Sequence, residues 1–573
     1  MNISTLLNAR KTMLSIFAFC GILTTTNAQI FDWANQIEGS NTVLGLSVSS
    51  NGLDIYSTGT FKGTSDFNPG SGAHNLTSNG DYDVYIQKLD ETGNLIWAKN
   101  IGGSANEWCR VINDYSTHII ISGMFSNTVD FDPGAGTEMR TSNGGYDAFI
   151  LALDPVGNFL WVQTFGESDN ESIGGQELDS SNDLIITGSF TDSMTVDIGG
   201  VPETRYATGG SSSDVFVLKM DLLTGNAIWL KSFGGSAIDK GSDLVIKSND
   251  NILLTGTFRN IMDANPDTSS ASIFALDVSG FTNTFLVELD PIGDFVNAFS
   301  FENSNVMEVN DIELDADDNI YLTGPFKNTT DFDLKSGVTN LSSSGGQDCY
   351  VVKLTPAKDL VWAKAFGGPG LEQSFGIEVA ANGDVYTAGR YSTNTDFDPG
   401  AAVDNYTAVG SGQDIFIHKL DAAGDFQFVY TFGQVGTDIA RGLEIDVDGN
   451  MYVNGQFNGT IDFDPTGGTA NLTAGSNTAT DAFLLKFAAL PAGISEIENI
   501  ELSIYPNPVK HQFFIELENE TITEINVIDY SGRIVKTINK NVNSVNVSDL
   551  QQGIYILKVD TKNGISTTRF VKQ

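Results

Sequence analysis

Apolar and polar residues alternate with a period of two along most of the chain, and no stretch of useful length shows helical periodicity. The clearest alternation lies in segments that begin with an aspartate and end near Lys-Leu-Asp, such as 83–90, 147–154 and 414–421. Alternation of this kind places successive side chains on opposite faces of a β-strand. The pattern predicts a protein built almost entirely of β-strands.

The predicted strands recur in seven repeats. Each repeat contains a Thr-Gly-x-Phe-like element, and the glycines of these elements lie 64 to 68 residues apart, at Gly59, Gly123, Gly188, Gly256, Gly324, Gly389 and Gly455. Every repeat has four segments of strand character, which we name a to d. Segments a and b are separated by dipeptides such as Asn51-Gly52, which suit a two-residue hairpin. Segment b carries the glycine element, segment c the alternating run and segment d an aromatic residue such as Trp97. The period predicts seven four-stranded antiparallel sheets.

The two ends of the repeat array predict that it closes. The seventh repeat stops near Leu490 without a segment d, and a matching segment, 31–36, precedes the first repeat. An N-terminal strand that completes the last sheet removes the exposed sheet edges of an open array. We therefore expect residues 29–490 to form a seven-bladed β-propeller, closed by its N-terminal strand.

The repeats resemble the SBBP-type β-propeller repeat of exported bacterial proteins. The resemblance is carried by the T-G-x-F, D-F-x-P-G and D-x-F-I-x-K-L-D elements over residues 29 to about 490. It implies the propeller fold and no particular activity, because propellers host binding, scaffolding and catalysis alike.

Residues 1–28 have the pattern of a signal peptide. Arg10 and Lys11 precede an apolar run over 13–23, and the small residue Ala28 ends a cleavage signal before Gln29. The run is too short to span a bilayer as a stable helix, and no second apolar run of roughly 18 residues follows. We expect an exported protein without a transmembrane segment.

The C-terminal residues depart from the repeat pattern. We interpret 491–500 as a linker and 501–573 as a small Ig-like β-sandwich. This segment contains Tyr505, Pro506, Asn507 and Pro508 in a Y-P-N-P start, an S-G-R turn, and a G-x-Y-x-L-K-V strand with Gly553, Tyr555 and Lys558.

These motifs, in this order, resemble the type A C-terminal sorting domain of the type IX secretion system of Bacteroidota. The resemblance implies that the domain contacts the secretion machinery. It also implies export through the periplasm to the outer cell surface or the medium. The alternative is an ordinary Ig-like adhesive module.

Charge and cysteine content narrow the function classes. The chain has 573 residues with 72 acidic and 30 basic side chains, a net charge of −42. Such a charge repels nucleic-acid phosphates and anionic lipids, so we exclude nucleic-acid and membrane-surface binding. Beyond the signal peptide the only cysteines are Cys109 and Cys349, which we expect to be unpaired core residues.

The long connections between segments b and c carry the only candidate site chemistry, and strand direction places them on one face. Two aspartates at i and i+2, followed by a third about 15 to 17 residues later, supply the oxygen ligands that Ca²⁺ prefers. The candidate calcium ligands form three sets: Asp130, Asp132 and Asp147; Asp396, Asp398 and Asp414; Asp462, Asp464 and Asp481. The alternative is structural, with the aspartates capping turns and Phe131 and its counterparts fixing each loop to its sheet.

The sequence contains no catalytic or cofactor-binding motif such as H-E-x-x-H, G-x-S-x-G or G-x-G-x-x-G, so we name no catalytic residue and no other cofactor. Two function classes stay open. The first is a secreted or cell-surface binding or adhesion protein whose ligand is an extracellular glycan or protein. The second is an exported carbohydrate-active hydrolase or lyase that uses paired carboxylates of the propeller. Seven nearly equivalent loops favour the first class, because an active site breaks the symmetry of a repeat.

Overall fold

The structure is a computed structural model. It describes residues 29–210, 212–266, 273–275, 281–303, 305–475, 480–489, 503–516, 522–529, 534–538, 542–550, 552–561 and 565–573. The regular secondary structure of these residues consists of β-strands, which confirms the predicted all-β class. The predicted signal peptide and linker lie outside the described residues. Contacts divide the chain into two compact units, one formed by Gln29–Ala489 and one that includes Leu490–Gln573.

In the described part of the larger unit the strands pair antiparallel in groups of four, here called sheets, and each group takes one strand from each of the segments a to d. The first strands are β2 (Val43–Ser50), β6 (Glu107–Asp114), β12 (Glu171–Leu178), β18 (Lys240–Ile246), β25 (Asp311–Leu314), β31 (Gln373–Val379) and β37 (Ile439–Ile445). The second strands are β3 (Asp54–Asp66), β7 (Ile119–Phe125), β13 (Asp183–Thr191), β19 (Ile252–Arg259), β26 (Ile320–Phe326), β32 (Val385–Tyr391) and β38 (Met451–Phe457).

The third strands are β4 (Asn75–Asp90), β10 (Asp147–Leu153), β16 (Ser213–Asp221), β22 (Thr282–Leu289), β29 (Asp348–Leu354), β35 (Asp414–Leu420) and β41 (Asp481–Ala489). The fourth strands are β5 (Leu95–Gly103), β11 (Phe159–Phe165), β17 (Ala227–Gly235), β23 (Phe295–Ser300), β30 (Leu360–Phe366), β36 (Phe426–Phe432) and β1 (Gln29–Gly39). Pairing in every sheet runs from the first strand to the fourth in this order.

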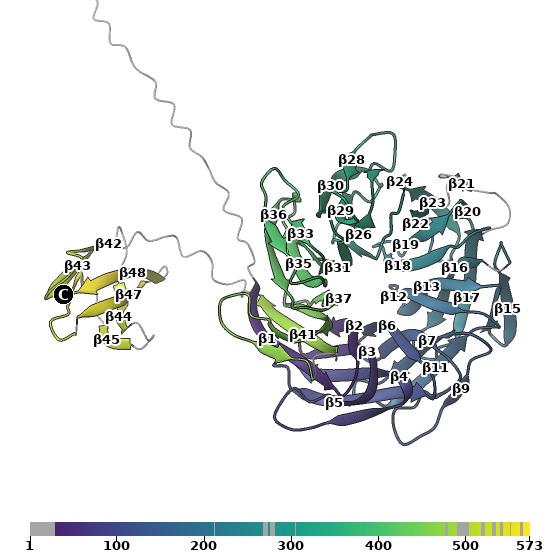
Figure 1. The fold of residues 1–573 in the computed structure, drawn as a ribbon, viewed down its shortest axis with the longest axis horizontal. Helices are drawn as coiled ribbons and strands as arrows, with labels where there is room; N and C mark the ends of the chain where they lie inside the picture. The colour runs from purple at the N-terminus through teal and green to yellow at the C-terminus, as the bar shows by residue number, and fades with distance from the viewer. Residues whose placement is uncertain are drawn as a thin grey trace, which may run out of the picture. The chain divides into compact units, whose positions relative to one another are not determined.

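The sheets follow one another around a closed ring of the β-propeller type (Figure 1). Each first strand contacts the first strand of the next sheet, and β37 contacts β2. The N-terminal strand β1 pairs antiparallel with β41, from Gln29 opposite Ala489 to Ile37 opposite Ala482. This pairing confirms that a strand from the N-terminus completes the last sheet.

The glycine of the Thr-Gly-x-Phe element is required by the close approach of the first and second strands. A Cβ atom at Gly188 would lie 2.0 Å from the carbonyl oxygen of Ser172 on β12. The equivalent glycines of the other sheets have the same clash, at 1.8 to 2.2 Å. The repeated glycine is therefore a packing requirement of the sheet.

The connections between second and third strands contain short hairpins that the sequence pattern did not predict. Their strands are β8 (Thr128–Asp130) with β9 (Met139–Thr141), β14 (Ser193–Ile198) with β15 (Val201–Tyr206), β20 (Ile261–Asp263) with β21 (Ile273–Ala275), β27 (Thr329–Asp331) with β28 (Asn340–Ser342), β33 (Asn394–Asp396) with β34 (Asn405–Thr407), and β39 (Thr460–Asp462) with β40 (Asn471–Thr473). In the first sheet the ends of β3 and β4 form the equivalent hairpin.

Several of these hairpins pair with the end of the preceding sheet. β8 pairs with β5, where Gly102 lies opposite Asp130, and β20 pairs with β17 in the same way. The short strand β24 (Glu302–Asn303) pairs with β27. The connections thus join neighbouring sheets, which explains why they are long.

The C-terminal unit contains two antiparallel sheets that share one apolar core. A three-stranded sheet consists of β42 (Ser503–Tyr505), β43 (Gln512–Glu516) and β46 (Ser544–Asn546). A four-stranded sheet consists of β45 (Ile534–Ile538), β44 (Ile522–Asp529), β47 (Gly553–Thr561) and β48 (Ile565–Lys572). Phe513 and Val545 of the first sheet pack with Val527, Leu557 and Phe570 of the second.

Candidate functional site

The acidic connections are built as capped turns. Asp130 Oδ1 accepts hydrogen bonds from the backbone N–H groups of Asp132 at 3.2 Å and Glu138 at 2.8 Å. Asp132 Oδ1 accepts one from Gly134 at 2.8 Å. The same bonds recur at Asp396, Asp398, Asp462 and Asp464. The loop carboxylates therefore organise their own turns.

The phenylalanine between the two aspartates fixes each loop to its sheet. Phe131 is fully buried and packs edge-on against Phe125, with their ring centroids 5.1 Å apart. Phe397 and Phe463 are equally buried and contact Tyr391 and Phe457. These contacts match the structural alternative to a calcium loop, in which the aspartates cap turns and the phenylalanine fixes the loop to its sheet.

The third aspartate of each predicted calcium set lies at a sheet junction. Asp147 is buried, and both of its carboxylate oxygens accept from the N–H of Asn143, at 3.2 and 3.3 Å. Asp414 and Asp481 accept from backbone N–H groups in the same manner. Among the described residues no three Asp, Glu, His or Cys side chains gather in a way that would hold a metal ion. The observed hydrogen bonds are those of turn caps, and the three calcium sets stay a prediction.

A second buried carboxyl accompanies the junction aspartate at most junctions. The pairs are Asp83 with Glu107, Asp147 with Glu171, Asp214 with Asp239, Asp348 with Glu372, and Asp414 with Asp438. Burial raises the pKa of Asp147 to about 6, and burial with the nearby Asp147 charge raises the pKa of Glu171 to about 8. These groups hold protons near neutral pH because burial disfavours the charged form.

The cysteines and buried histidine offer no nucleophile or general base. Cys109 and Cys349 are buried and unpaired, as expected, and burial raises the pKa of the Cys109 thiol to about 12. Burial lowers the pKa of His418 to about 3, and its Nε2 lies 3.0 Å from the carbonyl oxygen of Phe397. A thiol and an imidazole in these states serve packing.

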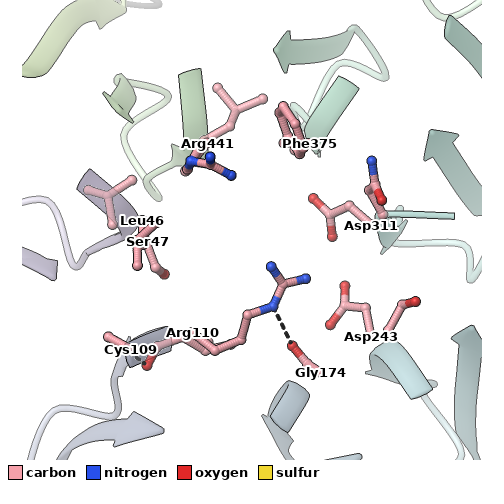
Figure 2. Close-up of a pocket in the computed structure, with 16 residues that line it drawn as sticks. Leu46, Ser47, Cys109, Arg110, Gly174, Asp243, Asp311, Phe375 and Arg441 are labelled. Atoms are coloured by element: carbon pink, nitrogen blue, oxygen red, sulfur yellow. Dashed lines mark hydrogen bonds between the residues drawn. The ribbon is translucent and has the colours of Figure 1, made fainter. Parts of the chain in front are cut away.

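The residues that differ most between repeats meet in a cavity at the centre of the ring. This central cavity, of about 260 Å³, is lined by residues of, or next to, the first strands of all seven sheets. Figure 2 shows Arg110 on β6, Asp243 on β18, Asp311 on β25, Phe375 on β31 and Arg441 on β37 around the opening. The sheets present arginine, aspartate, phenylalanine and small side chains to the same space.

Backbone bulges aim several of these side chains. The register of β6 with β7 shifts between Cys109 and Val111, which makes Arg110 an extra residue. The same shift in β31 and β37 falls at Phe375 and Arg441. A bulge bends the strand and redirects its extra side chain. Leu46, Gly174 and Ser242 occupy the equivalent bulges in other sheets.

One wall of the central cavity is cationic. The Arg441 and Arg390 guanidinium carbons lie 5.3 and 5.5 Å from the ring centroid of Phe375. Burial, with the charges of Arg390 and Arg110, lowers the pKa of Arg441 to about 10. Arg110 Nε donates to the Gly174 carbonyl oxygen at 3.4 Å, which leaves the rest of its guanidinium toward the opening (Figure 2).

The opposite wall is acidic. Asp243 Oδ2 accepts from the N–H of Ile312 at 3.3 Å, and Asp311 Oδ2 from that of Ile377 at 2.7 Å. Burial raises the pKa of both carboxyls, and for Asp311 the charge of Asp243 adds to the effect. Both carboxyls line the same cavity and influence each other's titration.

Four first strands also carry a glutamate, two residues beyond the position that Asp243 and Asp311 occupy in their own strands. These residues are Glu177, Glu313, Glu378 and Glu444. Burial raises the pKa of Glu177 to about 7 and that of Glu313 and Glu444 to about 8. After burial, the charge of Glu177 raises the pKa of Glu313, and the charges of Glu313 and Glu177 raise that of Glu444.

Sequence reasoning missed the central cavity. Arg110 and Arg441 lie in segment a, which is short and carries no motif. A signal becomes visible when the repeats are superimposed on their glycines, because Arg110 and Arg441 then share a position with Leu46 and Gly174. That the position faces a cavity depends on closure of the ring.

The sorting-motif residues lie in the C-terminal unit. Tyr505 ends β42 and stacks on Phe514 at 5.6 Å, and Asn507 Oδ1 accepts from the N–H of Val571 at 2.9 Å. Gly553 begins β47, where Tyr555 stacks on Phe570 at 5.5 Å. Pro506 and Pro508 flank Asn507, and Lys558 is in β47. Tyr505, Gly553, Tyr555 and Lys558 therefore lie in strands, whereas residues 506–508 lie between β42 and β43.

Two curated proteins show partial sequence similarity to the chain. An uncharacterized WD repeat-containing protein of Acanthamoeba polyphaga mimivirus is 20% identical over 466 residues, covering 69% of this chain and 33% of that protein. The regulatory protein FlaEY of Caulobacter vibrioides is 26% identical over 224 residues, covering 38% of this chain and 21% of that protein. The chain thus spans about a third and about a fifth of these relatives.

Solved structures give distant likenesses. The quinohemoprotein alcohol dehydrogenase from Comamonas testosteroni is 10% identical, with 81% of this chain and 76% of that chain covered and a TM-score of 0.36. PorZ, a surface component of the type-IX secretion system of Porphyromonas gingivalis, is 10% identical, with 94% and 100% covered and a TM-score of 0.18. Scores this low support no inference about this chain.

The C-terminal unit has a specific match. Residues 503–573 match the family described as the secretion system C-terminal sorting domain. Among the described residues there is no apolar helix of the length that a membrane crossing requires. The chain therefore carries a type IX sorting domain, which indicates export by that system to the cell surface or the extracellular space.

Proposed function

We propose that the protein is an exported binding protein. Residues 1–28 are its signal peptide, residues 29–490 form a seven-bladed β-propeller of the SBBP type, and residues 501–573 form an Ig-like sorting domain. Such a sorting domain is typical of Bacteroidota. The ligand is an extracellular glycan, and its site is the central cavity.

The observation that carries this proposal is the loss of repetition at the cavity. At six equivalent bulges the side chains are Leu46, Arg110, Gly174, Ser242, Phe375 and Arg441. A position that served only the fold would repeat, as the packing glycine and the loop phenylalanine do. Small-ligand sites are concave, with a few convergent polar groups, and the central cavity has this character.

A filled-cavity variant tests where the ligand binds. We expect Ser242→Trp to abolish binding to an array of neutral and acidic oligosaccharides, since the indole occupies the central cavity. The matched control is Val403→Trp, at an exposed position of an acidic loop. Binding that survives Ser242→Trp and is lost in Val403→Trp would place the ligand on the loop face and refute the cavity as its site.

Removal of the sorting domain tests the export step. A chain that ends before residue 503 is expected to accumulate in the periplasm, whereas the full chain reaches the surface or the medium. Fractionation with an antibody to the propeller measures the difference. Equal export of both chains would contradict the role of the domain.

A carbohydrate-active hydrolase or lyase is the second candidate, because two carboxyls, Asp243 and Asp311, line the central cavity and burial raises the pKa of both. Glycosidic bond cleavage commonly uses two carboxyls, one protonated and one ionised. Release of reducing ends or unsaturated sugars by the wild type, and its loss in Asp311→Asn, would establish this activity. Binding without turnover favours the first candidate.

A further inference from the structure

We propose that the central cavity recognises the carboxylate of an acidic saccharide, a uronic acid residue, through Arg110 and Arg441. The inference rests on the proposed function, since it takes the cavity as the ligand site. It adds the chemical class of the ligand and the residues that select it.

The first support is the state of the two arginines. Neither Arg110 nor Arg441 forms an ion pair within the part of the chain that the structure describes, and the chain as a whole carries a charge of −42. Buried lysines between the sheets, by contrast, are paired, as Lys88 is with Asp54 at 2.7 Å and Lys419 with Asp384 at 2.7 Å. The charge of Arg110 acts on Asp243 across the cavity, but neither guanidinium forms a direct ion pair among the described residues, so both can donate to the oxygens of an added anion.

The second support is the burial of Arg441. Its Nε is buried without a hydrogen-bond partner among the described residues, and its guanidinium lies against Phe375. Arg390 on the same ring has a partner, since its Nε donates to Gln373 Oε1 at 3.0 Å. A buried charge without a counterion is costly, and an anion that enters the cavity relieves that cost.

The shape and charge of the opposing walls select the type of anion. A guanidinium presents its N–H groups in a planar fork that matches a carboxylate. The acidic wall of Asp243 and Asp311 disfavours a dianion such as a phosphate monoester. Burial raises the pKa of both carboxyls, and a carboxyl that holds a proton can both donate to and accept from hydroxyl groups. A monoanion that also carries hydroxyls, as a uronic acid does, fits both walls.

The size of the cavity agrees with this ligand. Its volume of about 260 Å³ lies just below the range of roughly 300 to 1,000 Å³ typical of small-ligand sites. The Phe375 ring lies at the cationic wall, with the guanidinium of Arg441 against it (Figure 2).

Titration calorimetry on the mature full-length chain at neutral pH and low salt tests the proposal, with glucuronate, glucose and inorganic sulfate as probes. We expect glucuronate to bind at least about tenfold more tightly than glucose, and Arg110→Gln and Arg441→Gln each to lose about tenfold or more in affinity for it, the range of a charge-assisted hydrogen bond. Arg441→Lys keeps the positive charge without the planar array of N–H groups. Its affinity for glucuronate should therefore lie between those of the wild type and Arg441→Gln. The matched control is Arg259→Gln, since Arg259 is exposed and bonds to Thr282 Oγ1.

Equal binding of glucuronate and glucose, absence of glucuronate binding, or no effect of either Gln substitution would overturn the proposal. Sulfate that binds as tightly as glucuronate would overturn the saccharide part. The thermal midpoint of each variant shows whether it folds, and Arg441→Lys provides the test if a Gln variant does not. If the cavity binds neutral glycans and Ser242→Trp abolishes that binding, the proposed function stands and the proposed selectivity for a carboxylate is rejected.

Discussion

The acidic loops and the central cavity are built on the same seven repeats, but the loop residues recur between repeats whereas the cavity residues vary. In the loops the capping aspartates recur from sheet to sheet, at Asp130, Asp396 and Asp462 with the same acceptor atom and the same pair of backbone donors. In the cavity Arg110 and Arg441 share their position with an apolar or a small residue in other sheets.

The difference separates what holds the ring together from what it recognises. A feature that recurs in most sheets serves a need that they share. The loop strands β8 and β20 pair with the preceding sheet, and five loops bury a phenylalanine: Phe67, Phe131, Phe332, Phe397 and Phe463. A feature that changes at each repeat at the same place serves no common structural need. Symmetry in a repeat protein therefore marks structure, and local loss of symmetry marks a candidate site.

Alanine variants of two phenylalanines, one in a loop and one in the central cavity, give the sharpest test of this difference. Phe131→Ala should lower the free energy of unfolding by about 3 to 5 kcal/mol, because it empties a fully buried position. Phe375→Ala, at the wall of the central cavity, should cost less stability and weaken ligand binding instead. Chemical denaturation and calorimetric titration of both variants measure the two effects. A Phe131→Ala protein of normal stability would show that the repeated loops do not hold the ring.

The buried carboxyl pairs at the sheet junctions predict a stability that falls as pH rises. Their pKa values are raised, to about 6 for Asp147 and about 8 for Glu171, so the folded state holds protons that the unfolded chain has released. Unfolding then releases protons, and stability decreases between the ordinary carboxyl pKa near 4 and the folded values of 6 to 8. We expect the thermal midpoint at pH 9 to lie at least about 5 °C below that at pH 5.

The control for this pH dependence is Glu171→Gln, which removes one of the titrating groups. The variant should flatten the fall in thermal midpoint between pH 5 and pH 9. Asp311→Asn, in the central cavity, should instead change the pH dependence of ligand binding. A midpoint that rises with pH over this range would show that the junction carboxyls are ionised in the folded protein.

The repeats made most of the fold predictable from sequence, because the packing glycine, the turn residues and the alternating strands are local signals. The hairpins of the acidic loops were not predictable, since β8 pairs with β5 of the preceding sheet and that pairing depends on how sheets stack. The calcium prediction rested on the spacing of Asp130, Asp132 and Asp147. Spacing did not reveal that backbone N–H groups already occupy these carboxylates.

The central cavity could not be predicted from local sequence signals for a further reason. It gathers Arg110 and Arg441, residues more than three hundred positions apart, and only the closure of the ring brings their strands to one place. The Asp243 and Asp311 pair likewise comes from adjacent sheets. A repeat pattern predicts the ring, whereas the chemistry at its centre follows from the residues in which the repeats differ.

Removing single caps should give a smaller effect that is the same in different sheets. Asp130→Ala and Asp396→Ala each remove an acceptor of two backbone hydrogen bonds, so each should lower the free energy of unfolding by about 1 to 2 kcal/mol. Asp130→Asn keeps an acceptor oxygen and should cost less. Denaturant titration measures the three variants, and a large loss in one sheet only would indicate that its loop has a separate role.

The smallest expected effect is that of a chelator. If the loop aspartates act as turn caps, as their hydrogen bonds to Asp132, Glu138 and Gly134 indicate, EDTA should leave the thermal midpoint unchanged within about 1 °C. Added Ca²⁺ should have equally little effect, because a bound ion would stabilise the folded state in proportion to the logarithm of its concentration. A midpoint that falls with EDTA and recovers with Ca²⁺ would restore the calcium sets Asp130, Asp132 and Asp147 and their equivalents as real sites. It would also make the loops, and not the cavity alone, a region of ligand chemistry.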